Sequence, residues 1–188
     1  LFVSSRKIIR IYMKKLSLTP TKLLILVSAV LFLIFWSVWF FCYRHYLIWL
    51  EGYSFFSTLP DFLTQYLDAK EGVPGYIGAF LHQFYAMPAL GAAIQSFLAV
   101  WPSACVGIVL LKLFRNPKGL LWIAVLPIVY ITYRQYWDLH LYYTIIANLA
   151  STLLMLVAVV VTAFRKPQWN VPEWLSNMFV NYALTLAG

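Results

Sequence analysis

A carboxylate, an imidazole and a guanidinium stand close together in the second half of this sequence. Asp138 and His140 are separated by one residue, and Arg134 precedes them by about one helical turn. Such a group could bind a phosphate or a metal ion, because it combines a cation with two kinds of metal-binding side chain. The alternative is that these side chains end helices and extend toward a membrane surface. The pattern makes Asp138 a candidate catalytic residue and Arg134 and His140 candidate binding residues.

A second group of such residues precedes residue 88. Asp61 follows Pro60 and could act as a general base, although a carboxylate at this place is also typical of the first turn of a helix. His82 and Gln83 are adjacent and could bind a ligand, or they could form a hydrogen-bonded pair at a membrane interface. The sequence contains no zinc spacing, Walker A loop or dinucleotide-binding glycine pattern. It therefore predicts no metal site and no cofactor.

Long apolar runs separate these groups and must position them. Hydrophobic residues make up 63% of the 188 residues and charged residues only 11%, whereas about 25% of residues are charged in soluble domains. Four apolar runs approach or exceed the length that crosses a hydrocarbon core of about 30 Å. They predict an all-α polytopic transmembrane helical bundle with four full spans, at about 23–43, 88–111, 119–137 and 139–164.

The positions of the cations predict the orientation of this bundle. Of the 14 Lys and Arg, only Arg44, Lys70 and Arg134 fall on the side opposite the N-terminus. Because cytoplasmic loops are rich in Lys and Arg, the N-terminus is predicted to be cytoplasmic. The acids follow the reverse pattern, since all except Glu173 are assigned to the outer face. Any chemistry is therefore expected on the outer face. The cations flank apolar runs, so the charge of +8 does not predict a nucleic-acid partner.

Composition and helix-breaking residues divide the rest of the chain. Residues 1–22 are predicted to form a basic cytoplasmic tail, and residues 23–188 a single transmembrane domain. Residues 44–87 are too apolar for a free loop, so they predict an external interfacial segment with two short amphipathic helices. Residues 172–188 predict a partial fifth hydrophobic segment, which is either an amphipathic C-terminal helix or a truncated span.

Three stretches of the sequence carry a resemblance to a known family. Residues 53–56, 60–63 and 74–91 resemble the first external loop of an uncharacterised bacterial family of polytopic membrane proteins, known only as a domain of unknown function. The resemblance covers about residues 20–188 and implies a helical inner-membrane protein without a particular activity. Because such proteins generally continue with further spans, the resemblance also implies that the chain is an N-terminal piece of a longer protein.

The layout of the external segment is also similar to that of membrane glycosyltransferases that use polyprenyl-phosphate sugars. Those enzymes place an essential carboxylate in a long loop after the first span, where this chain has Asp61. Their motif of closely spaced acids is absent, because Asp61 and Asp68 are seven residues apart. The similarity is one of layout, and layout does not establish function.

The leading functional hypothesis is an integral protein of the bacterial inner membrane that acts through helix-mediated association in the cell envelope. Its partners would be the lipid bilayer and either other membrane subunits or a lipid-linked substrate. The alternative is a glycosyltransferase-like enzyme with its site on the outer face. A transporter component is a third hypothesis, but the apolar runs lack the ionisable residues at mid-depth that transport would need.

Overall fold

The computed structural model describes residues 19–114, 121–137 and 139–164, and every regular element within these ranges is a helix. The prediction of an all-helical chain is therefore confirmed. Most of the predicted N-terminal tail and the whole predicted C-terminal segment, residues 172–188, lie outside the described residues.

Three helices are long and apolar enough to cross a membrane: α2 (Pro20–Phe41), α6 (Pro88–Leu113) and α8 (Tyr142–Phe164). They correspond to the first, second and fourth predicted spans. The first two begin with proline, whose missing N–H costs nothing in the first turn of a helix. The side chain of Thr19 caps α2 by accepting a hydrogen bond from the backbone N–H of Lys22 at 3.4 Å.

The third predicted span is not one regular helix, so four full spans are not confirmed. It contains a 3₁₀ segment, η3 (Leu121–Val125), followed by α7 (Leu126–Trp137), which has 12 residues. Pro127 explains the change, because it has no N–H to donate to the carbonyl four residues earlier. At about 1.5 Å per residue, α7 alone is about 18 Å long, which is too short to cross a hydrocarbon core.

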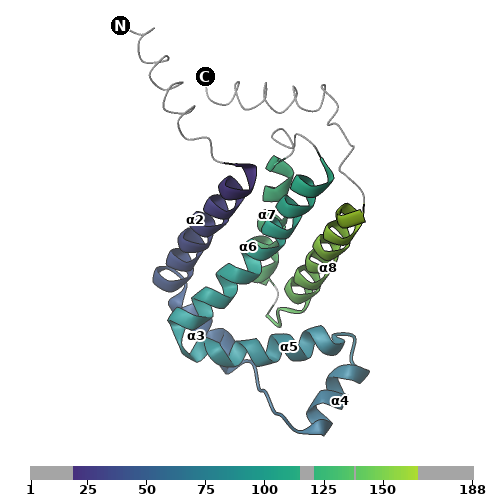
Figure 1. The fold of residues 1–188 in the computed structure, drawn as a ribbon. Helices are drawn as coiled ribbons and strands as arrows, with labels where there is room; N and C mark the ends of the chain where they lie inside the picture. Colours follow the sequence, from purple (N-terminus) through teal and green to yellow (C-terminus); the bar gives the residue numbers. More distant parts are fainter. Residues whose placement is uncertain (1–18, 115–120, 138, 165–188) are drawn as a thin grey trace, which may run out of the picture.

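Four helices form a bundle in which α6 occupies the centre, and α2, α7 and α8 pack against it (Figure 1). In the most apolar 18-residue window of each helix, 61% of the window is buried in α6, compared with 6% in α2 and 22% in α8. The outward faces of α2 and α8 carry mainly aliphatic side chains. Such surfaces suit contact with lipid chains.

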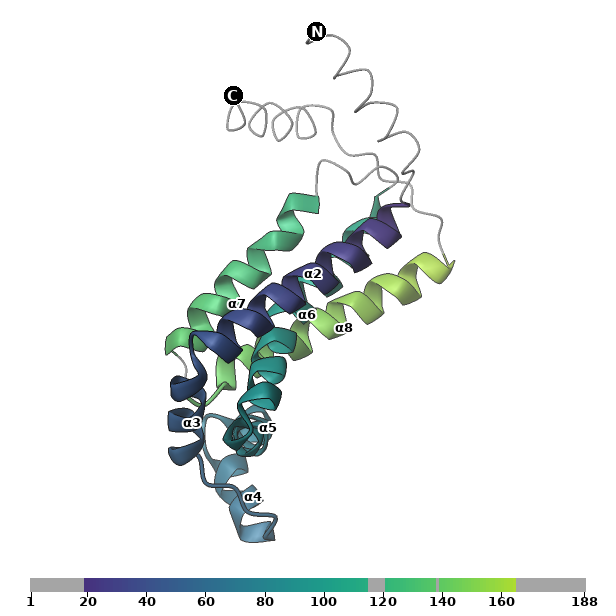
Figure 2. The same ribbon diagram turned by 90° about the vertical axis from the view of Figure 1, so that its left-hand side faces the viewer.

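Short helices cover one end of the bundle, which we call the α5 end (Figures 1 and 2). They are α3 (Arg44–Gly52), α4 (Pro60–Asp68), α5 (Gly72–His82) and the 3₁₀ helix η1 (Gln83–Ala86). The sequence predicted two helices in this segment, in the regions of α4 and α5, and did not predict α3. The amphipathic pattern of α3 is short, but two side chains of this helix, Leu47 and Leu50, are fully buried in the fold.

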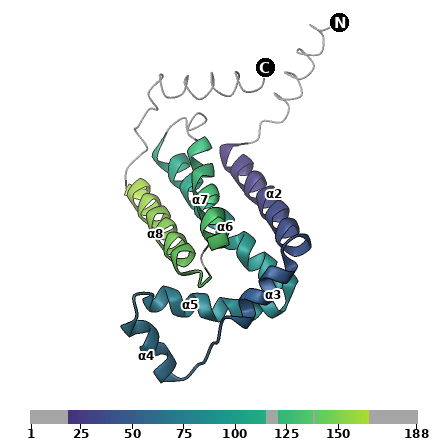
Figure 3. The same cartoon turned by 180° about the vertical axis from the view of Figure 1, so that it is seen from behind.

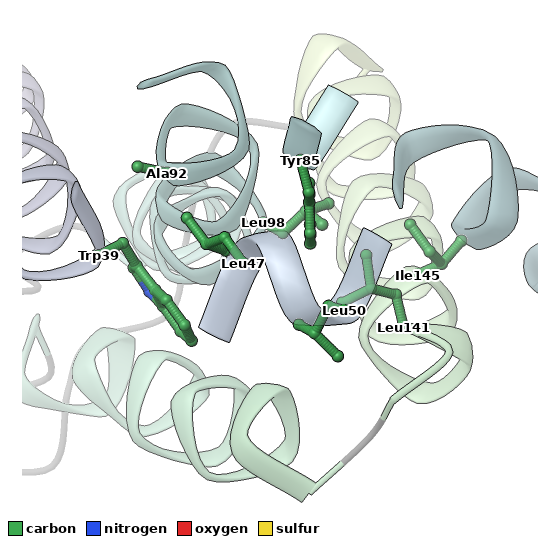
Figure 4. Close-up of a cluster of buried hydrophobic side chains, with 8 residues drawn as sticks. All are labelled: Trp39, Leu47, Leu50, Tyr85, Ala92, Leu98, Leu141 and Ile145. Carbon is green, nitrogen blue, oxygen red and sulfur yellow. The ribbon is translucent and has the colours of Figure 1, made fainter. Parts of the chain in front are cut away.

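The main hydrophobic core lies where the short helices meet the bundle. Tyr85 of η1 stands near its centre, among side chains from α2, α3, α6 and α8 (Figure 4). Its buried members are Trp39, Leu47, Leu50, Tyr85, Ala92, Leu98, Leu141 and Ile145. This core fixes the α5 end to α6 and α8, and therefore sets the positions of the candidate site residues.

Candidate functional site

Asp61 is exposed in the first turn of α4. Its backbone carbonyl accepts a hydrogen bond from the hydroxyl of Thr64 at 2.8 Å. In all three overall views α4 lies beyond α5, on the side away from the bundle (Figure 3). This placement fits a first-turn carboxylate that interacts with the helix dipole, and it does not bring Asp61 into the interior of the α5 end.

His82 is completely buried at the end of α5. Its ring stands 4.9 Å from the ring of Tyr85, edge to face, and neither of its nitrogens has a hydrogen-bond partner among the described residues. Burial, followed by the charge of nearby His140, lowers the pKa of His82 to about 4. Burial also raises the pKa of Tyr85 well above 10, with a smaller contribution from Tyr46. Both rings are therefore neutral at pH 7.

The side chain of Gln83 makes a hydrogen bond within the fold. Its Nε2 donates to the carbonyl oxygen of Ser54 at 2.9 Å, and the hydroxyl of Ser54 donates to the carbonyl of Ala79 at 3.4 Å. These two bonds tie the segment after α3 to α5. Of the two adjacent residues that the sequence singled out, His82 therefore keeps free polar atoms and Gln83 acts as a link.

The predicted group at the junction of α7 and α8 is described only in part, because Asp138 lies outside the described residues. The guanidinium of Arg134 lies over the ring of Tyr143, with 4.0 Å from its Cζ to the ring centroid, which is a cation–π contact. His140 is exposed, and its backbone carbonyl packs against Gly78 of α5. The fold thus brings His140 toward His82, which was not expected from their distance in the sequence.

Four buried side chains form a second polar group inside the bundle, which we call the polar cluster: Gln95 of α6, Gln135 of α7, and Thr144 and Asn148 of α8. The Nε2 of Gln135 donates to the backbone carbonyl of Gln95 at 2.8 Å. The Nδ2 of Asn148 donates to the carbonyls of Leu98 and Thr144, at 3.0 and 2.9 Å. These bonds hold the three helices together near the α5 end.

The spacing of residues along α6 places Tyr85 next to the polar cluster. A Cβ built on Gly91 would lie 3.1 Å from the Tyr85 ring, and Leu98 belongs to the same core cluster as Tyr85. Gly91, Gln95 and Leu98 share one face of α6, because they follow each other at helical spacing. Gln95 therefore lies between Gly91, which packs against Tyr85, and Leu98, which belongs to the same core cluster.

Several atoms of this interior have no hydrogen-bond partner among the described residues. They include both side-chain atoms of Gln95, Oε1 of Gln135, Oγ1 of Thr144, Oδ1 of Asn148, the hydroxyls of Tyr85 and Ser103, and Nε of Arg134. Buried polar groups normally have partners, so these atoms can accept a ligand or water. In the part of the chain that the structure describes, no group of three His, Cys, Asp or Glu could hold a metal ion.

The sequence indicated part of this arrangement. Gln95 and Asn148 lie within apolar runs, a pattern that predicts interhelical hydrogen-bonding groups, and the structure confirms this prediction for the side chain of Asn148. Thr144 and Tyr85 were not singled out as site residues. The signal for Thr144 was present, because it stands one turn before Asn148 on the same face of α8. Nothing in the sequence placed Tyr85 beside this face.

The described structure defines a helical protein with three apolar helices of membrane-spanning length. The chain belongs to a family of unknown function, DUF6057, whose model matches residues 19–188. This confirms the resemblance to an uncharacterised family. No curated protein and no solved structure matches the chain.

Proposed function

We propose that this chain is a multi-pass protein of the bacterial cytoplasmic membrane that works by associating with another membrane subunit through α2. The observation that carries this proposal is a shallow, open depression on the surface of α2, which we call the hollow. Its lining residues follow each other at helical spacing along one face of the helix: Val30, Leu33, Ile34, Ser37 and Val38.

The shape of this hollow suits a side chain of a neighbouring helix. In coiled-coil packing, a knob from one helix enters a hole formed by four residues of the other, at a spacing that matches the lining of this hollow. Ser37 provides the small residue that lets membrane helices approach closely. Its hydroxyl donates to the carbonyl of Leu33 at 2.8 Å, so the hollow presents a surface without a free hydroxyl proton.

The distribution of cations supports an N-terminus in the cytoplasm. Lys22 starts α2 and Lys112 lies in the last turn of α6, at the end of the bundle opposite α5. The cations that the sequence assigns to the other side, Arg44, Lys70 and Arg134, lie at the α5 end. The positive-inside rule then places α3, α4 and α5 on the outer face.

Photo-crosslinking in intact cells tests the association. Leu33 of α2 is the test position and Leu153 of α8 is its matched control, because their side chains are 59% and 63% exposed. A photoreactive amino acid at Leu33 should crosslink to one protein of defined mass, and the same group at Leu153 should not. Ser37→Leu, which fills the hollow, should reduce the Leu33 product by about tenfold. Equal crosslinking at the two positions, or no effect of the substitution, would contradict the proposal.

The second candidate is a glycosyltransferase-like enzyme with its site on the outer face. One observation favours it: His140 lies near His82, and a cation of α7, Arg134, lies over the ring of Tyr143, three residues after His140. Asp61 does not join this group, which leaves Asp138 as its catalytic candidate. Asp138→Asn should abolish a cell-surface glycan phenotype while Asp61→Asn preserves it. A normal phenotype for Asp138→Asn, at normal protein level, would exclude this candidate.

A further inference from the structure

A half-enclosed cavity of about 190 Å³ lies between α2, α6 and the junction of η3 with α7. Its closed side adjoins a buried core cluster, to which Val100 of α6 and Ile128 of α7 belong. Three other lining residues are exposed, so the cavity opens between them: Leu23 and Val27 of α2 and Val125 of η3. Because these side chains are aliphatic and α2 has membrane-spanning length, the opening would face the hydrocarbon chains of a bilayer.

The cavity is part of a closely packed interface, in which α2 runs along α6 (Figure 2). A Cβ built on Gly107 of α6 would lie 2.6 Å from Cδ1 of Leu24, and Leu24 also lines the cavity. Gly107 follows Ser103 by about one helical turn, so the close contact lies beside the cavity. The volume therefore arises from small side chains in the lining, Ser28, Ser103 and Ala124, and not from a separation of the helices.

Ser103 brings an unpartnered hydroxyl group to the lining of this cavity. The residue is 7% exposed, and its Oγ has no hydrogen-bond partner among the described residues. Several other hydroxyl side chains of the bundle donate to a carbonyl one turn earlier in their own helix: Ser37, Ser96, Thr132, Thr152 and Thr162. A buried donor without an acceptor costs free energy. A ligand that offers Ser103 a hydrogen-bond acceptor would remove this cost.

The size and polarity of the cavity narrow the class of this ligand. An apolar cavity of about 150 Å³ in another protein holds benzene, so the volume here suits a single ring with few substituents. A charged ligand would lose its hydration without compensation, because Ser28 and Ser103 are the only polar side chains in the lining. Water would leave most of the apolar wall unfilled, since apolar cavities stay dry. A carbonyl oxygen accepts a hydrogen bond and brings no proton that needs a second acceptor.

We propose that the cavity between α2 and α6 binds a ring-sized, uncharged lipophilic molecule that presents a carbonyl oxygen to Ser103. The ligand enters from the bilayer between the exposed aliphatic side chains at the opening, and its ring packs against the apolar walls. The hydroxyl of Ser103 donates a hydrogen bond to the carbonyl oxygen. The cavity shares no lining residue with the hollow on α2, so this proposal and the proposed association can fail separately.

Cyclohexanone and methylenecyclohexane are matched probes, because they have nearly the same shape and only the first has a hydrogen-bond acceptor. Each is titrated into the purified full chain in micelles, and the saturable rise in melting temperature gives its affinity. Ser103→Ala should not lower the melting temperature without ligand, since its hydroxyl has no partner. It should weaken cyclohexanone binding about fivefold and leave methylenecyclohexane binding unchanged. Partition into the micelles is the same for both proteins and cancels. No saturable rise with cyclohexanone, or equal affinities of the two proteins for it, would overturn the proposal.

Two neighbouring small residues of α2 provide a matched pair that tests the place of binding. Ser28 lines the cavity, whereas Ala29 is exposed and does not. Ser28→Leu should fill the cavity and weaken the binding of both probes by about tenfold or more, while Ala29→Leu binds them like the parent chain. Equal binding by the two folded variants would show that the probes bind elsewhere and would overturn the proposal. If Ser28→Leu fails to fold, the Ser103→Ala result decides alone.

Discussion

The side-chain amide of Asn148 in α8 donates a hydrogen bond to the backbone carbonyl of Leu98 in α6, with 3.0 Å between nitrogen and oxygen. Leu98 is the residue four positions before Pro102, whose ring nitrogen has no hydrogen to donate. The carbonyl that the proline leaves without its helical donor therefore receives one from the neighbouring helix. In a lipid-covered bundle, such a replacement is needed, because water is not available to serve the freed group.

This relationship predicts that Pro102 and Asn148 are energetically coupled. Asn148→Leu should lower the free energy of unfolding by about 1–2 kcal/mol, because the Leu98 carbonyl then lacks a partner. In a Pro102→Ala background the helix supplies its own donor, so the same substitution should cost less, with a coupling energy of about 0.6–1.5 kcal/mol. A double-mutant cycle, measured by reversible unfolding in mixed micelles, checks this value.

Gln135→Leu serves as the control for the cycle. It removes a similar bond from α7 to α6, but the acceptor is the carbonyl of Gln95, whose helical donor residue, Ala99, is not a proline. The decrease in the free energy of unfolding caused by Gln135→Leu should be the same with and without Pro102→Ala, within about 0.5 kcal/mol. If Gln135 couples to Pro102 as strongly as Asn148 does, the explanation through the Leu98 carbonyl is wrong.

Gly78 is predicted to be required for the contact between α5 and the start of α8. A Cβ at this position would collide with the backbone carbonyl oxygen of His140, which cannot rotate away as a side chain could. Gly78→Ala should therefore lower the stability by about 1–3 kcal/mol. Gly52→Ala, at the end of α3, is the control, because nothing lies within 4 Å of its added Cβ. Equal melting temperatures for the two variants would contradict this packing.

His82 is predicted to make the stability depend on pH. Its pKa is about 4 in the folded chain and about 6.5 in the unfolded chain, so the unfolded state binds more protons between these values. Stability should consequently fall as the pH is lowered from about 6.5 to 4, by about 3 kcal/mol in total. Thermal unfolding across this range should show the loss in the parent chain and much less of it in His82→Gln. His45→Gln, at an exposed position of α3, should behave like the parent.

The sequence was sufficient to predict the long helices, because their apolar runs and first-turn prolines act locally. It did not show that residues 119–137 divide into η3 and α7, although a proline inside an apolar run, here Pro127, predicts a bend. It also gave no indication of α3, whose stability depends on burying Leu47 and Leu50 against distant residues. Tertiary burial determines such short helices, and local propensity does not reveal it.

The candidate site was predictable only as a set of residue types. Charge and side-chain chemistry singled out Asp61, His82 and Arg134, yet the fold exposes the first, buries the second and stacks the third on an aromatic ring. The polar cluster was harder to find, because Gln95 and Gln135 come from different helices and meet only after the bundle forms. A single polar residue in an apolar run indicates an interior position, but it does not identify its partner.

The predicted membrane topology can be tested at two exposed lysines that lie near opposite ends of α6. Lys70 lies between α4 and α5, beyond the start of α6, and Lys112 lies in the last turn of that helix. Because α6 has 26 residues, its ends are about 39 Å apart, enough to cross the hydrocarbon core. Single cysteines at these positions, with Cys42 and Cys105 replaced by serine, should therefore react differently with a membrane-impermeant maleimide. Position 70 should label in intact spheroplasts and position 112 only after permeabilisation. Labelling of both from outside would mean that α6 does not span, and the reverse pattern would place the N-terminus outside.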